Sequence, residues 1–222
     1  MRPAFLAYLS LSLLAPAAFA DGPSEALQPS PAIRTVSAAA PAANLAPIVL
    51  DESTERCRPL AKRASVPSVA QQLSARIALA SCIADARMEP LSLIDGQESV
   101  LAIEDAVKPG FAMLDGVVDA GDASVKIMAL RAKADLYSVM CMRMMNTVPG
   151  SANTTPEAAS LRETRRQIVD GMVVPWHERT RETHQAIVDL GKKHPELVRN
   201  PVVQTAIRDS ERQLAQIALA NS

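Results

Sequence analysis

From residue 51 to the end of the chain, apolar side chains recur at intervals of three and four residues, the spacing of one helical face. No stretch alternates apolar and polar residues around a hairpin turn, so the sequence predicts no sheet. The pattern predicts an all-α fold, an antiparallel bundle or array of five to six helices joined by short links. Helices are expected at about 68–87, 100–118, 122–146 and 155–191, and from residue 201 onward.

Two of these stretches contain an internal proline. The apolar phase continues unchanged across Pro109, which favours one kinked helix over two separate helices. Pro175 lies inside the 155–191 stretch and is expected to bend that helix in the same way. Side chains that cap helix starts precede three of the stretches, at Asp122, Thr155 and Asn200.

The 122–146 stretch carries apolar residues on two faces. Such a helix is packed on two sides, so we expect it to lie at the centre of the array. One stripe contains Val125, Met128, Ala132, Leu136 and Val139, and the other contains Ile127, Leu130, Ala134, Tyr137 and Cys141.

The N-terminal fifty residues have a different character. Residues 1–20 combine a positive charge at Arg2 with an apolar run that ends in small residues at 18–20, which predicts a cleaved signal peptide. Residues 21–50 are rich in Ala, Pro and Ser and are interpreted as a disordered lead-in to a single helical domain at 51–222. These features predict a periplasmic or secreted protein.

Composition argues against two classes of partner. The net charge is −1 at pH 7, and after the expected cleavage the only aromatic residues are Phe111, Tyr137 and Trp176. Nucleic-acid sites need positive charge or stacking platforms, so we expect no nucleic-acid partner. No stretch of the expected mature chain reaches eighteen consecutive apolar residues, so no membrane span is expected.

Three cysteines leave the disulfide pairing open. A bond between Cys57 and Cys82 would stabilise the fold by roughly 3 kcal/mol in the chain-entropy model. Pro59 suggests that Cys57 lies in an irregular stretch that can reach across, which favours this pair, while Cys82 with Cys141 is the competing alternative. Because Cys141 lies within an apolar stripe, it is interpreted as a buried, unreactive thiol.

Residues 140–145 form the densest group of sulfur side chains in the chain. Soft sulfur ligands suit Cu(I), so an alternative function is periplasmic small-molecule or soft-metal binding through Cys141, Met144 and Met145. On a helix, however, only residues three or four apart share a face, and packing in the core accounts for this spacing without a metal. No metal or cofactor is therefore expected.

Two histidines share a helical face in the second half of the chain. His177 and His184 are seven residues apart, about 10 Å along a helix, which is too far for both to bind one metal ion without other ligands. Together with Trp176 and Arg181 they define a possible ligand or partner face, or simply a hydrated, charge-paired surface.

Standard catalytic motifs are absent from the sequence, including G-x-S-x-G, H-E-x-x-H, phosphate loops and C-x-x-C. The leading hypothesis is an exported, non-enzymatic helical protein that binds or scaffolds a cell-envelope component, with a cell-envelope protein as the candidate partner. An enzyme with a site near His177 and His184 is a further alternative, so the sequence leaves the question of enzymatic activity open.

Overall fold

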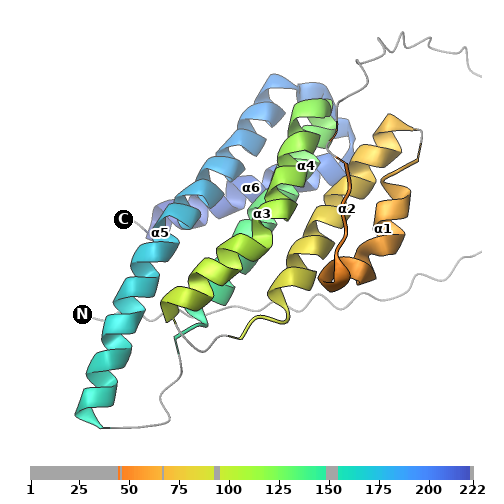
Figure 1. The fold of residues 1–222 in the computed structure, drawn as a ribbon. Coiled ribbons are helices and arrows are strands. Elements are labelled where there is room, and N and C mark those ends of the chain that lie inside the picture. Colours follow the sequence, from red (N-terminus) through yellow and green to blue (C-terminus); the bar gives the residue numbers. More distant parts are fainter. Residues whose placement is uncertain (1–44, 46, 67, 93–95, 149–154, 221–222) are drawn as a thin grey trace, which may run out of the picture. The chain divides into compact units, whose positions relative to one another are not determined.

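The computed structural model describes residues 45, 47–66, 68–92, 96–148 and 155–220. Within these ranges the protein is all-α, as predicted, with six α-helices, two short 3-10 helices and no strand (Figure 1). The expected signal peptide, residues 1–20, and most of the expected lead-in lie outside the described residues. The elements are η1 (Glu52–Cys57), α1 (Arg58–Arg63), α2 (Val69–Met88), α3 (Gly96–Ala120), α4 (Ala123–Met145), α5 (Pro156–Lys193), η2 (Pro195–Arg199) and α6 (Pro201–Ala220).

Side-chain caps fix the starts of three long helices at the residues that the sequence indicates. The backbone N–H of Val125 donates to the Asp122 carboxylate at the start of α4. Thr155 and Asn200 accept equivalent hydrogen bonds at the starts of α5 and α6. Each cap satisfies a backbone donor that has no partner within its own helix.

The two internal prolines lie within continuous helices. Pro109 is inside the 25-residue α3, and Pro175 is inside the 38-residue α5. Proline removes one backbone donor from each helix, but the flanking residues keep the apolar phase that packs them on their neighbours. The prediction of one helix across each proline is therefore correct.

Helix α4 is the central element of the array, as its two apolar stripes predict. It packs against α2, α3, α5 and α6. Leu136, Tyr137 and Met140 of α4 belong to the largest hydrophobic cluster, which also includes residues of α2, α3 and α5. Ile127 belongs to a second cluster with residues of α5 and α6. One helix thus connects most of the core.

A glycine allows α2 and α3 to approach each other closely. A Cβ atom added at Gly110 of α3 would lie 2.9 Å from the backbone oxygen of Ala80 and 3.3 Å from Cβ of Ala84, both in α2. A distance below 3.0 Å to a backbone atom requires the backbone to move. By contrast, a Cβ atom at Gly116, on the same helix, would meet nothing within 4 Å.

These two glycines give a matched pair of substitutions. We expect Gly110→Ala to destabilise the protein by about 1–3 kcal/mol, because the added methyl group forces α2 and α3 apart. Gly116→Ala should stabilise it by about 0.5–1 kcal/mol, because alanine has the higher helix propensity and no new contact forms. Urea denaturation followed by circular dichroism measures both effects. Equal changes in the two variants would contradict this account of α2–α3 packing.

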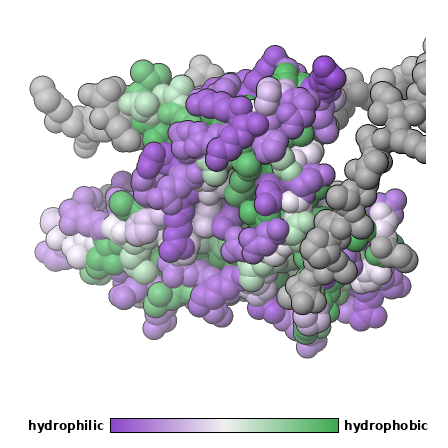
Figure 2. All heavy atoms as spheres, turned by 90° about the horizontal axis from the view of Figure 1, so that it is seen from above, coloured by the Kyte–Doolittle hydropathy of each residue, from purple (hydrophilic) through white to green (hydrophobic). Residues whose placement is uncertain are grey.

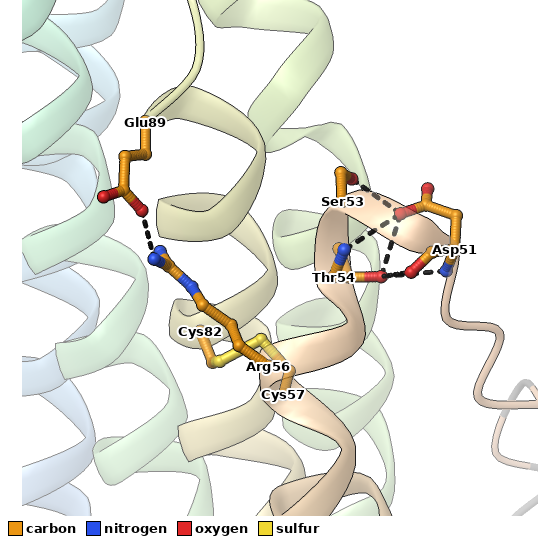
Figure 3. The surroundings of a disulfide bond; sticks show 7 residues. All are labelled: Asp51, Ser53, Thr54, Arg56, Cys57, Cys82 and Glu89. Carbon is orange, nitrogen blue, oxygen red and sulfur yellow. Dashed lines mark hydrogen bonds and ion pairs between the residues drawn. A yellow bond between two sulfur atoms is a disulfide. The ribbon is translucent and has the colours of Figure 1, made fainter.

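The N-terminal elements are attached to α2 by a disulfide and by ion pairs. The sulfur atoms of Cys57 and Cys82 are 2.02 Å apart and form a disulfide bond (Figure 3). Cys141 is a buried free thiol. Arg56 pairs with Glu89, and Asp51 pairs with Arg87. These contacts anchor the N-terminal elements to the C-terminal part of α2.

The local structure around Cys57 differs from the expected irregular stretch. Cys57 ends the 3-10 helix η1, and Pro59 lies in the first turn of α1, where proline is well tolerated. Asp51 caps η1 by accepting hydrogen bonds from Ser53 and Thr54 (Figure 3). These bonds, assisted by the charge of Arg87, lower the pKa of Asp51 to about 2. The capping box therefore orders a segment that proline alone suggested was irregular.

The last residues of the expected lead-in contact the helical domain. Ile48 and Leu50 pack against the cluster that contains Cys57, and Leu45 packs against a cluster formed by α2, α3 and α4. Their apolar side chains alternate with the exposed Pro47 and Val49. Such a short extended segment has no helical periodicity, which is why the sequence pattern did not distinguish it from a linker.

The disulfide should contribute substantially to stability. Opening it releases a loop with a sequence separation of 25, and we expect Cys57→Ala/Cys82→Ala to lower the free energy of unfolding by about 2–4 kcal/mol. Chemical denaturation with and without a reductant measures this. The double variant serves as the control, because its stability must not respond to the reductant. A wild-type protein that is equally insensitive would contradict the pairing.

Among the described residues, none of the helices combines the length and hydropathy needed to cross a bilayer. The face shown in Figure 2 carries mostly hydrophilic side chains, with hydrophobic residues in small groups between them.

Candidate ligand-binding site

The three aromatic residues after position 20 come together although each lies on a different helix. Phe111 is on α3, Tyr137 on α4 and Trp176 on α5. The ring centroids of Phe111 and Tyr137 are 4.4 Å apart, and those of Tyr137 and Trp176 are 6.0 Å apart. Both distances lie within or close to the range of favourable aromatic pairs. The rings form a continuous row across three helices.

Polar contacts orient the tryptophan at the end of this row. Its indole Nε1–H donates to the Glu104 carboxylate of α3, at 3.0 Å. The guanidinium group of Arg179, one turn further along α5, lies over the indole ring at 4.5 Å from the centroid. This position gives a cation–π contact. The orientation of Trp176 is thus determined by α3, α4 and its own helix.

A pocket of about 630 Å³ opens beside the row of rings and is lined by residues of α3, α4 and α5. We call it the aromatic pocket. Its volume lies in the range of small-molecule sites. Tyr137, Val107 and Thr183 form buried parts of its wall, while Phe111 and Trp176 are partly exposed. The charged lining residues are Glu104, Lys108, Asp115, Lys133, Arg179 and Glu182.

Most of the charges around the aromatic pocket are already engaged. Lys133 pairs with Asp115 across α4 and α3, and Lys108 pairs with Asp105 along α3. The Glu104 carboxylate accepts the Trp176 bond. The lining therefore combines the apolar rings with six charged side chains, four of which are already paired or hydrogen-bonded.

The structure divides the possible ligand or partner face rather than bringing its four residues together. Trp176 lies in the aromatic pocket, His177 is exposed, and Arg181 is hydrogen-bonded to Glu178 on the surface of α5. His184 is buried, with Nδ1 3.1 Å from the Ser210 hydroxyl of α6. Because α6 covers α5 at His184, the two histidines differ in environment despite their helical spacing.

The His184–Ser210 pair lacks the access that catalysis needs. Ser210 is fully buried and His184 is only 5% exposed, so a substrate cannot reach the hydroxyl directly. Burial lowers the pKa of His184 below its ordinary value of 6.5, the charge of Arg131 lowers it further, and Asp135 opposes both. The pair therefore stabilises the contact between α5 and α6 with a neutral imidazole.

This environment makes stability depend on pH. The unfolded chain takes up a proton at His184 near pH 6.5, whereas the folded chain does so only at lower pH, so stability present above pH 6.5 is lost on acidification. The slope can approach about 1.4 kcal/mol per pH unit for one proton. We expect His184→Gln to flatten the dependence between pH 7 and 5.5 in denaturation experiments. His177→Gln should keep the wild-type slope, and a similar flattening there would rule out His184 as the cause.

The sulfur cluster at 140–145 is divided between core and surface. Cys141 and Met144 are buried in the main hydrophobic cluster, whereas Met145 is 44% exposed. Burial raises the pKa of Cys141 to about 11, so the thiolate that a soft metal prefers is disfavoured. Among the described residues, no group of three or more His, Cys, Asp or Glu side chains is arranged to hold a metal ion.

Sequence reasoning identified only Trp176 among the residues of the aromatic pocket. It missed Glu104 and Phe111 of α3, Tyr137 of α4 and Arg179 of α5, because the sequence does not show which faces of different helices meet. One signal was available. Phe111 lies on the apolar stripe of the stretch expected to be helical at 100–118. Tyr137 lies on one of the two apolar stripes of the predicted central helix. Stripes that face each other bring such rings together.

Comparisons of this chain with family models, with curated protein sequences and with solved structures gave no match.

Proposed function

We propose that this protein is an exported, non-enzymatic helical domain that binds a component of the cell envelope in the aromatic pocket. The observation that carries the proposal is the convergence of Phe111, Tyr137 and Trp176 on one pocket of about 630 Å³. The charged N-terminal leader supports export, and the disulfide between Cys57 and Cys82 is compatible with an oxidising compartment.

The lining of the pocket favours binding over nucleophilic catalysis. Its described residues include no serine, cysteine or histidine, and the hydroxyl of its threonine, Thr183, donates to the backbone oxygen of Arg179 rather than to a general base. Glu104 and Asp115 are engaged by Trp176 and Lys133, respectively. These bonds hold the walls of the pocket in place, as expected of a preformed recognition site.

The test uses a variant that fills the pocket. Ala112 lines the pocket and is exposed, so Ala112→Phe should block the site without disturbing the core. Ala159→Phe on the exposed surface of α5 is the matched control. Purified protein is incubated with a small-molecule extract of the host's cell envelope, washed, and examined by native mass spectrometry.

We expect the wild type and the Ala159 variant to retain the same bound small molecule. The Ala112 variant should retain at least about tenfold less, since the side chain occupies the space of the ligand. Circular dichroism and thermal melting must first show that all three proteins are folded. Retention that is equal in all three, or absent in the wild type, would contradict a binding function for this pocket.

A further inference from the structure

Two opposite charges at the aromatic pocket have no ion-pair partner among the described residues. Arg179 contacts the Trp176 ring but forms no hydrogen bond or ion pair there, and Glu182, one turn along α5, forms none either. The charge of Glu182 interacts electrostatically with Arg181, but the Arg181 guanidinium group donates its hydrogen bonds to Glu178. The rim therefore presents a cationic group and an anionic group, both exposed and both available.

Tyr137 supplies a further polar group in the lining. Its side chain is only 5% exposed, but its hydroxyl oxygen is not itself fully buried, and it forms no hydrogen bond in the described part of the chain. The hydroxyl can therefore form a hydrogen bond with a ligand in the pocket.

We infer that the aromatic pocket takes an α-amino acid with an aromatic or other apolar side chain. Its carboxylate pairs with Arg179, its ammonium group pairs with Glu182, and its side chain lies against the exposed parts of Phe111 and Trp176. Tyr137 supplies a further hydrogen bond. This inference rests on the proposed function and specifies the ligand of the same site.

A zwitterion fits better than a singly charged ligand. Arg179 and Glu182 are only three residues apart on α5, so a bound anion would lie near an unpaired carboxylate and a bound cation near an unpaired guanidinium. Either arrangement leaves one charge unsatisfied beside a like charge. A ligand that carries a carboxylate and an ammonium group on one carbon atom pairs with both side chains. Its binding adds no net charge to the pocket.

The experiment compares three compounds that differ by one charged group. L-Phenylalanine carries both groups, 3-phenylpropanoate lacks the ammonium group, and 2-phenylethylammonium lacks the carboxylate. Isothermal titration calorimetry at pH 7 gives the affinities. Because Trp176 is the single tryptophan of the chain, its fluorescence, excited at 295 nm, reports whether a compound binds at this site.

We expect phenylalanine to bind at least about tenfold more tightly than either analogue, since each lost charge-assisted pair weakens binding by that order. Arg179→Gln should weaken phenylalanine and 3-phenylpropanoate but leave 2-phenylethylammonium unchanged or tighter. Glu182→Gln should do the reverse. Tyr137→Phe should weaken phenylalanine several-fold. Arg166→Gln, on the exposed surface of α5 outside the pocket, is the control and should change none of the affinities.

Two results would overturn the inference while the proposed binding function stands. One is an analogue that binds as tightly as phenylalanine with a change in Trp176 fluorescence. The other is failure of all three compounds to bind a protein that retains a molecule from the envelope extract in a manner blocked by Ala112→Phe. Failure of both the compounds and the extract would instead overturn the proposed function itself.

Discussion

The row of rings across α3, α4 and α5 is the interaction on which the site depends. Tyr137 of α4 lies between Phe111 of α3 and Trp176 of α5. The hydrogen bond from Trp176 to Glu104 then connects α5 directly to α3. Three helices are thereby joined in a closed set of contacts. The planes of neighbouring rings are inclined by 31° and 34°, so the rings meet at an angle rather than as a flush stack. The aromatic pocket opens beside this inclined row.

The remaining packing holds these three helices in register. Gly110 lets α3 lie close to α2, and the disulfide joins α2 to the N-terminal elements. On the opposite side, Arg131 of α4 pairs with Asp135 of its own helix and with Asp209 of α6. Helix α4 packs against α2, α3, α5 and α6, which explains why a helix with two apolar faces is needed at the centre.

Much of the fold follows from residues that act locally or repeat regularly. The caps at Asp122, Thr155 and Asn200 and the apolar phase across Pro109 predict the boundaries and continuity of the long helices. The site is different, because it depends on how helices rotate about their axes and on which part of a helix is covered. His177 and His184 share a helical face, but α6 covers only one of them. Periodicity within one helix contains no information about such neighbours.

The aromatic rings and the charged rim of the aromatic pocket differ in how much they contribute to the fold. Tyr137 belongs to the main hydrophobic cluster and Phe111 and Trp176 pack against it, so changes to the rings alter the fold as well as the pocket. Arg179 and Glu182 are exposed on the rim and belong to no hydrophobic cluster in the described residues. Exposed charges contribute little to folding but strongly affect which ligand charges are tolerated. Under the proposed binding function, substitution at the rim therefore changes ligand preference at small cost in stability, whereas the row of rings forms the pocket itself.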